Sequence, residues 1–138
     1  MIQTLVDLDE LGHDAGFWYL ASPYSGYTPR VHMDTPARLA QAFGIVAAAA
    51  GWLIGQRVPV FSPIAHSHAI AEACSLDPLS LDVWLPVDEP FMTAATGLLV
   101  LELPGWRHSA GVKAEMTHFQ MEGKPAWLLP WPSNCGGR

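Results

Sequence analysis

The sequence predicts a single α/β domain with a doubly wound, flavodoxin- or Rossmann-like parallel sheet that carries helices on both faces. The 138 residues are half hydrophobic and only 14% charged, which is typical of a chain that builds one core. Strand-like and helix-like stretches alternate along the chain, as in parallel sheets wrapped by helices. The stretch 98–103 is almost continuously apolar, which indicates a central strand covered on both sides.

The first half of the chain predicts two strands around a long helix. The aromatic-rich run 17–21 predicts a buried strand, and the stretch 22–35 predicts a loop because it is rich in proline, glycine and small polar residues. Asp34 lies just before a Thr-Pro pair, a favourable helix start, and helical periodicity continues over 36–55. The short run 58–62 predicts a strand at an edge of the sheet, because it contains a proline.

The second half predicts the remaining strands and helices. Its most apolar segments are strands, and its periodic segments are helices. In order, they are a short helix within 63–74, an irregular or helical stretch at 77–87, a helix from Asp88 to Gly97, the strand at 98–103, a loop at 104–111, a helix at 112–122 and a strand at 126–129.

These elements place the folded domain at residues 17–130. Residues 1–16 are predicted to be an N-terminal extension or short helix, and 131–138 a polar tail. The N-terminus carries acids where a signal peptide has basic residues. The most apolar stretch, 42–54, is shorter than a bilayer requires, so we expect no membrane partner.

Charge and cysteine content restrict the partners further. The net charge is −6 with only seven Lys and Arg, so we expect no nucleic acid polymer as a partner. The two cysteines, Cys74 and Cys135, lack metal-ligand spacing and do not make a disulfide framework. A reduced, cytoplasmic location is therefore expected.

No cofactor motif occurs in the chain. Dinucleotide-binding, P-loop and nucleophile-elbow motifs are all missing from the sequence. His66 and His68 form an H-x-H pair, but no third residue at ligand spacing accompanies them. We therefore expect neither a cofactor nor a metal, with a metal-dependent hydrolase that uses these histidines as one alternative.

The helix at 112–122 and the loop before it offer the first candidates for chemistry. Ser109 and Gly111 are small residues at the start of this helix, where unpaired backbone N–H groups favour an anion such as phosphate. Glu115 lies about one turn into the helix, close to that anion site. A carboxylate there also simply suits the helix dipole, so a structural interpretation stays open.

Asp88 and Tyr19 are further candidates, and each has a structural alternative. Asp88 precedes a predicted helix and can act as its N-cap, or it can contact a heterocycle. Tyr19 lies in the first strand and can pack in the core or hydrogen-bond a catalytic carboxylate. The loop that follows the strand adds polar groups at Ser22, Tyr24 and Ser25.

Four pieces of the sequence together resemble a known family. They are FWYLASPYSG near the N-terminus, the helix that begins at Asp88, the segment LLVLELPGW, and SAGVKAEM followed by GKPAWLL. In this order they resemble the nucleoside 2-deoxyribosyltransferase superfamily, and they are most similar to its uncharacterised branch DUF1937. The resemblance covers residues 17–129.

The resemblance implies an enzyme that cleaves or transfers the N-glycosidic bond of a nucleoside or nucleoside 5′-monophosphate. It implies that Glu115 is the nucleophile, that Asp88 assists the leaving base, and that Tyr19 orients Glu115. The reaction would be a retaining glycosyl transfer through a covalent sugar ester. A serine at Ser109 favours a 5′-monophosphate, because the related nucleotide N-glycosidases carry serine there.

The same resemblance implies further substrate contacts and a homodimer or homotetramer. The substrate-binding residues would be Ser22, Tyr24, Ser25, Trp106, Arg107, Ser109 and Gly111, with the loop around Arg30 nearby. Trp106 can stack a base, and the fork of Arg107 suits phosphate. The runner-up function is a non-catalytic nucleotide-binding or sensor domain of the same fold.

Overall fold

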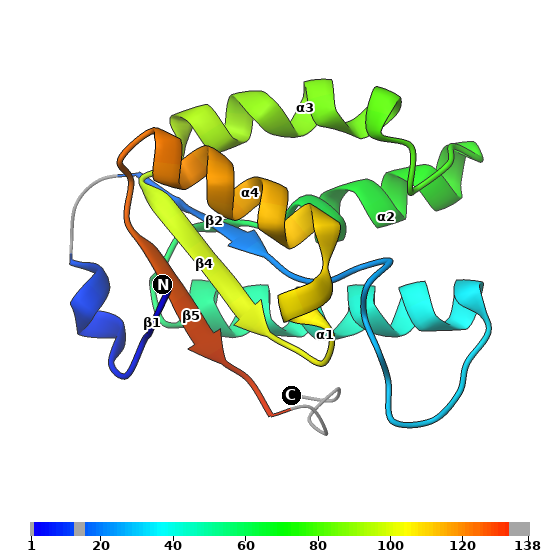
Figure 1. Ribbon diagram of the computed structural model, residues 1–138, viewed down its shortest axis with the longest axis horizontal. Helices are drawn as coiled ribbons and strands as arrows, with labels where there is room; N and C mark the ends of the chain where they lie inside the picture. The colour runs from blue at the N-terminus through cyan, green and yellow to red at the C-terminus, as the bar shows by residue number, and fades with distance from the viewer. Residues whose placement is uncertain (1, 13–15, 133–138) are drawn as a thin grey trace.

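The computed structural model describes residues 2–12 and 16–132, and its centre is a five-stranded, all-parallel sheet. The strand order is β1-β5-β4-β2-β3 (Figure 1). The strands are β1 (Gln3–Thr4), β2 (Trp18–Ala21), β3 (Val60–Phe61), β4 (Gly97–Glu102) and β5 (Ala126–Pro130). The predicted parallel α/β fold is confirmed, with β4 between β2 and β5.

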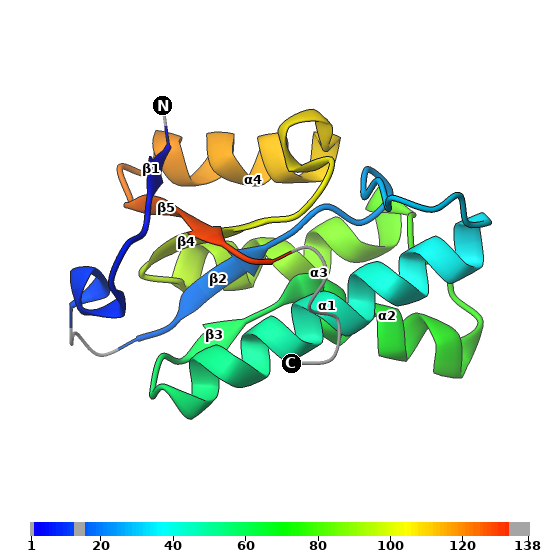
Figure 2. The same cartoon turned by 90° about the horizontal axis from the view of Figure 1, so that it is seen from below.

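Helices cover both faces of the sheet, as predicted. They are α1 (Thr35–Gly55), α2 (Pro63–Cys74), α3 (Leu81–Ala94) and α4 (Ala110–Met121). α1 lies on one face, and α4 lies on the other with α3 beside it (Figure 2). Alternate residues of β4 enter the two cores: Leu99 packs toward α1, whereas Leu98 and Val100 pack toward α4.

The carboxyl ends of β2 and β4 form the switch point of the sheet. The chain leaves β2 toward α1 and leaves β4 toward α4, so ligands of such sheets bind in the crevice between these strand ends. The two loops meet there, because the Thr28 N–H donates to the Pro104 carbonyl at 3.0 Å. A Cβ on Gly26 would lie 3.1 Å from the Cα of Ser109, a tight contact, so glycine favours this close approach.

α1 begins where the sequence predicts it. The Asp34 Oδ1 accepts a hydrogen bond from the Ala37 N–H at 2.9 Å. The helix is 21 residues long, and its length and apolar composition are those of a membrane-spanning helix. Core helices of globular proteins can have the same length and composition. The argument that the stretch 42–54 is too short was therefore wrong, because the helix extends beyond it. One face, with Val46 and Leu53, is fully buried against the sheet.

α3 begins seven residues earlier than predicted and places Asp88 in its interior. The prediction was wrong because an acid followed by proline resembles a helix start, and because Pro86 and Pro90 both indicate helix breaks. Both prolines lie inside α3. An N-cap role for Asp88 is therefore excluded, and its presence must be explained in another way.

The N-terminal segment adds a strand that the sequence did not predict. β1 pairs in parallel with β5, with Gln3 opposite Trp127, and Leu5 is buried in the core on the α1 side. A short 3-10 helix, η1 (Leu8–Leu11), follows it. In the predicted tail, Trp131 is buried in the same core, and residues 133–138 lie outside the described part of the chain.

Candidate active site

Three polar side chains from three elements converge on the α4 side of the sheet. Tyr19 comes from β2, Asp88 from α3 and Glu115 from α4. Each carboxyl acts on the pKa of the Tyr19 phenol, and Asp88 and Tyr19 both act on the pKa of Glu115. The structure therefore brings together the three residues that the sequence assigned to catalysis.

Glu115 is a carboxyl whose ionisation is strongly disfavoured. Burial raises its pKa to about 8, and the nearby charge of Asp88 adds to the rise. The Tyr19 hydroxyl opposes both effects, because a hydrogen-bond donor stabilises the ionised form. A pKa near neutrality is a property of groups that exchange protons or charge during catalysis.

Asp88 differs from Glu115 in its protonation at neutral pH. Burial raises its pKa to about 6, so the group is still mostly ionised at pH 7. Its half-buried carboxylate faces Glu115 and Tyr19 from the interior of α3. The Asp88 charge is close enough to raise the pKa of Glu115.

Tyr19 is a buried hydroxyl that stays protonated. Burial, followed by the charges of Glu115 and Asp88, raises its pKa far above the ordinary value. Its ring is held between Phe61 and Phe119, at centroid distances of 5.8 and 5.7 Å. This packing fixes the hydroxyl as a hydrogen-bond donor that faces the Glu115 carboxyl.

Two buried polar atoms of this region lack a hydrogen-bond partner within the described residues. They are the Tyr19 Oη and the Asp88 Oδ1. The Tyr19 hydroxyl lowers the pKa of Glu115, but its geometry falls short of a full hydrogen bond. Unsatisfied buried groups cost free energy, so their accumulation at one place indicates a site that a ligand completes.

Ser109 is the N-cap of α4, as its position in the sequence suggests. Its Oγ accepts the Val112 N–H at 3.3 Å, and the side chain is buried beneath Gly26. The hydroxyl is therefore already engaged in the helix. Gly111 is exposed in the first turn, where a Cβ would meet only the Ser109 Oγ at 3.9 Å, so this side of the helix start is open.

The loop after β2 contributes fewer contacts than the sequence indicated. The Tyr24 hydroxyl is buried and forms a hydrogen bond with the His68 Nδ1 at 2.5 Å, so it is not available to a substrate. Ser25 is exposed, and its carbonyl accepts a hydrogen bond from Arg38. Ser22 is the one predicted residue of this loop whose hydroxyl is buried and unpaired within the described residues.

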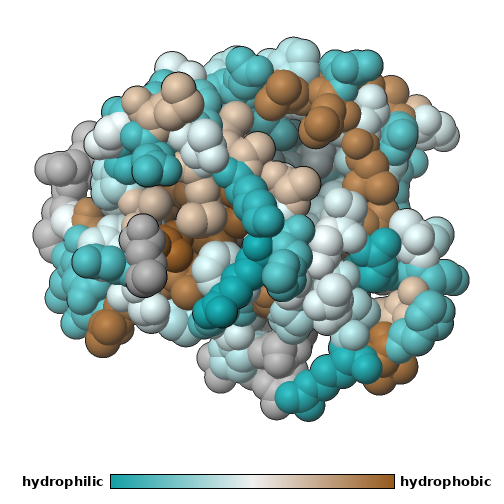
Figure 3. All heavy atoms as spheres, viewed as in Figure 1, coloured by the Kyte–Doolittle hydropathy of each residue, from teal (hydrophilic) through white to brown (hydrophobic). Residues whose placement is uncertain are grey.

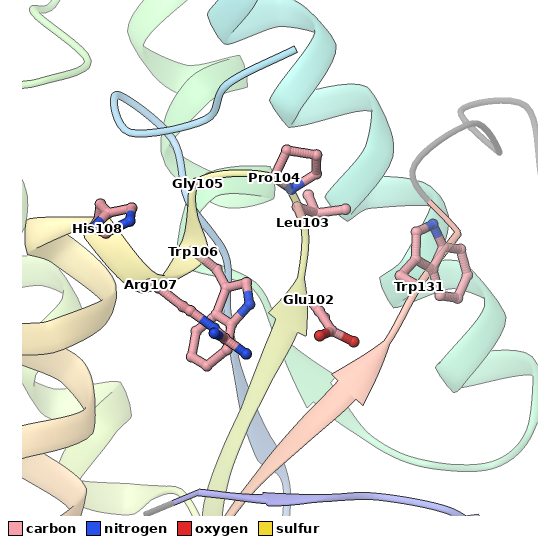
Figure 4. Close-up of a pocket in the computed structure, with 8 residues that line it drawn as sticks. All are labelled: Glu102, Leu103, Pro104, Gly105, Trp106, Arg107, His108 and Trp131. Atoms are coloured by element: carbon pink, nitrogen blue, oxygen red, sulfur yellow. The ribbon is translucent and has the colours of Figure 1, made fainter. Parts of the chain in front are cut away.

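Trp106 and Arg107 lie in a different place from the three polar residues. Both line a pocket of about 410 Å³ at the carboxyl end of β4, and that pocket is not lined by Tyr19, Asp88 or Glu115 (Figure 4). The Trp106 ring still packs against the core cluster that contains Tyr19. A direct contact of Trp106 and Arg107 with a substrate at Glu115 stays a prediction.

The histidines of the H-x-H pair diverge. His68 is buried, stacks on Phe43 at 4.4 Å and bonds to Tyr24, whereas His66 is exposed and packs beside Phe91. Within residues 2–12 and 16–132, no group of three His, Cys, Asp or Glu side chains is placed to hold a metal ion. The geometry gives no support to the metal-dependent alternative.

Aromatic side chains surround the three polar residues, and sequence reasoning noted only Phe91 among them. Phe61 and Phe91 stack face to face at 3.9 Å, and Phe119 packs on the other side of Tyr19. A signal was available for two of them. Phe91 lies three residues after Asp88 and Phe119 four residues after Glu115, spacings that place side chains on the same face of a helix.

Comparison with known proteins identifies a family. A family described as a domain of unknown function (DUF1937) matches residues 16–130. No curated protein matches the chain. The matched segment includes β2 to β5 and all four α-helices, and the chain therefore belongs to the DUF1937 family.

Proposed function

We propose that this protein cleaves or transfers the N-glycosidic bond of a nucleoside or nucleoside 5′-monophosphate, with Glu115 as the nucleophile. One observation carries the proposal: Tyr19, Asp88 and Glu115 converge in a partly buried place, and two of them keep polar atoms without partners among the described residues. Enzymes that transfer or hydrolyse glycosyl groups usually use two carboxyls with different pKa values, as Asp88 and Glu115 have here. The resemblance to the nucleoside 2-deoxyribosyltransferase superfamily assigns the same three residues.

The first step forms a sugar ester. An oxygen of the Glu115 carboxylate bonds to the anomeric carbon while the bond from that carbon to the base nitrogen breaks. The electron pair leaves with the base, which takes a proton from solvent. The Tyr19 hydroxyl donates toward Glu115 and holds it in the attacking orientation.

The second step releases Glu115. A water oxygen, or the nitrogen of a second base, attacks the anomeric carbon, and the ester oxygen departs with its electron pair as the Glu115 carboxylate. The attacking atom loses its proton to solvent. Water gives hydrolysis and a second base gives transfer, so the nature of the acceptor decides between the two reactions.

Asp88 is assigned to the base rather than to proton donation. Its pKa of about 6 leaves it ionised at the pH where Glu115 loses its proton, so it accepts hydrogen bonds from N–H groups of the base. An N–H donor would also satisfy the Oδ1 atom that the described residues leave unpaired. This arrangement favours bases that present an N–H or amino group.

A 5′-phosphate would be held by the start of α4. The first-turn N–H groups near Gly111 lie on the open side of the helix and favour an anion. The Ser109 hydroxyl supports this site indirectly, because it caps the helix. We therefore expect phosphorylated substrates to bind more tightly than free nucleosides.

A substrate panel tests the function. The wild-type chain is incubated with ribo- and deoxyribonucleosides, their 5′-monophosphates and a second free base, and released base is measured by chromatography. Glu115→Gln is expected to lower base release by at least about 10³-fold, because it removes the nucleophile. Glu89→Gln, a change of the exposed neighbour of Asp88, is the matched control and should keep full activity.

A catalytically silent nucleotide-binding domain is the second candidate, and one observation favours it. With a pKa of about 8, most Glu115 is protonated at pH 7 and can act as a hydrogen-bond donor. Nucleotide binding without base release from any member of the panel, and with binding weakened in Glu115→Gln, would select this candidate and exclude the enzyme.

A further inference from the structure

A second pocket lies at the carboxyl end of β4, apart from Glu115. It has a volume of about 410 Å³ and is lined by residues 102–108 and by Trp131, which follows β5. This volume is within the range of small-molecule sites. Figure 4 shows Glu102 between Trp106 and Arg107 on one side and Trp131 on the other.

The walls of the pocket combine flat apolar surfaces with groups of opposite charge. Trp106 presents an indole, and the Arg107 guanidinium lies over that ring at 5.3 Å from its centroid. Glu102 contributes a half-buried carboxylate from the last position of β4. Within the described residues, no ion pair joins Arg107 to Glu102, so both charges are available to a ligand.

Trp131 forms the second aromatic wall. Its ring is held edge-on against Trp52 at 5.8 Å and is more than nine-tenths buried. The Nε1 atom is also buried, and it has no hydrogen-bond partner in residues 2–12 and 16–132. Trp131 therefore contributes its ring to the pocket rather than its N–H group.

These groups specify the chemistry of a ligand. An indole selects a planar ring, a carboxylate selects amino or N–H donors, and a guanidinium selects acceptors. An organic cation fits less well, because Arg107 already occupies the face of Trp106. The complementary molecule is a planar heterocycle that has both an amino donor and acceptor atoms on its ring.

We propose that this pocket binds an amino-substituted nucleobase, separately from the site at Glu115. Glu102 accepts from the amino group, Trp106 forms an apolar wall beside the ring, and Arg107 donates to ring acceptors. The site is open to solvent, so we expect dissociation constants on the order of 0.1–1 mM. The proposal goes beyond the proposed function, because no step of the glycosyl transfer uses this pocket.

Binding is measured by NMR on the full chain with ¹⁵N-labelled indoles, in a Glu115→Gln background that prevents turnover. The chain has six tryptophans, and Trp131→Phe and Trp106→Phe identify the two relevant signals. Guanosine is compared with inosine, and adenosine with purine riboside, because each pair differs by the amino group. The amino compounds are expected to shift both signals and to bind about tenfold more tightly than their counterparts.

Glu102→Gln tests the recognition itself. It should weaken guanosine binding about tenfold and remove the preference over inosine, because it removes the charged acceptor. Asp82→Asn removes one negative charge from the first turn of α3, outside the pocket. It should change neither the affinity for guanosine nor the preference over inosine.

Three results would overturn the proposal. They are unchanged Trp106 and Trp131 signals with every nucleoside, equal affinity within each pair, and a preference that survives Glu102→Gln. A nucleoside that occupied only the Glu115 site would depend on Asp88→Asn rather than on Glu102→Gln. Since turnover is absent in this background, the outcome does not depend on whether base release is found in the wild-type chain.

Discussion

Glu115 combines a half-buried position with a role that requires charge. Because burial raises its pKa to about 8, most of the free protein carries a neutral carboxyl at pH 7. A nucleophile must be ionised, so the active fraction is small at neutral pH and grows with alkalinity. The positive charge that develops on the sugar in the transition state would favour the ionised form of Glu115.

The first prediction concerns this titration. We expect kcat/KM for base release to rise about tenfold per pH unit below pH 8 and to level off above it, because kcat/KM reports the free protein. Steady-state rates from pH 5 to 9.5 measure the profile. A rate that instead falls through pH 8 would make Glu115 an acid and reject its role as nucleophile.

The second prediction concerns stability. The pKa of Glu115 is higher in the folded chain than its ordinary 4.5, so between about pH 4.5 and 8 the unfolded state binds fewer protons and folding loses free energy as pH rises. Glu115→Gln removes this loss. We expect the variant to be more stable than wild type by about 1–3 kcal/mol at pH 8 and equal to it at pH 4.

Thermal unfolding of both chains across this pH range tests the second prediction. A gain of this size corresponds to several degrees in Tm for a chain of this length. Glu89→Gln, on the exposed side of α3, is the control and should show no such divergence. If the difference in Tm between Glu115→Gln and wild type stayed the same at every pH, Glu115 would ionise in the folded chain as easily as in the unfolded chain.

At the scale of the element, the N-termini of α3 and α4 provide a matched pair. The Ser109 side chain caps α4 through Val112, whereas the Ser80 side chain precedes α3 and makes no capping hydrogen bond. Both are serines at N-cap positions, so the sequence does not distinguish them. The difference arises from the side-chain geometry that each loop imposes.

The third prediction uses this pair. Ser109→Ala should destabilise the fold by about 1 kcal/mol, because it removes a cap from a helix that also carries Glu115. Ser80→Ala should cost only a few tenths of a kcal/mol, since no side-chain cap is lost. Chemical denaturation of the two variants compares them, and equal losses would show that the Ser109 cap contributes nothing specific.

At the scale of the whole molecule, large apolar side chains are exposed where α2 meets α3 (Figure 3, upper right). They are Ile70, Leu76, Leu79, Leu81, Val83 and Leu85. Contiguous exposed apolar surface on a folded chain marks an interaction surface. We place the contact of the expected homodimer or homotetramer here, with a second copy of the chain as partner.

The fourth prediction follows from this patch. The wild-type chain should sediment as a dimer or tetramer, and the double change Leu79→Lys and Leu81→Lys should shift it to the monomer, because two charges would be buried in the contact. Met121→Lys, which alters an exposed apolar residue on α4, should leave the mass unchanged. A monomeric wild type at micromolar concentration would contradict the expectation.

Local sequence patterns were sufficient for most of the elements. The apolar run at 98–103 predicted the central strand β4, the Asp34 cap predicted the start of α1, and the alternation of elements predicted the parallel sheet. They failed at the start of α3, because Asp88 was taken for a helix start and the stretch 77–87 was left as irregular or helical. Packing against α4 and the sheet retains the helix despite both prolines.

For the candidate site, the sequence alone nominated the candidate residues, because the acids, the tyrosine of the first strand and the small-residue helix start are visible in local patterns and in the resemblance to a family. Tertiary structure alone decided which of them meet. It brought Tyr19, Asp88 and Glu115 together, engaged Tyr24 with His68, and placed Trp106 with Arg107 in another pocket. It also paired β1 with β5. The physical reason is that residue type and spacing act within one element, whereas burial, pKa and edge pairing depend on elements that are distant in the chain.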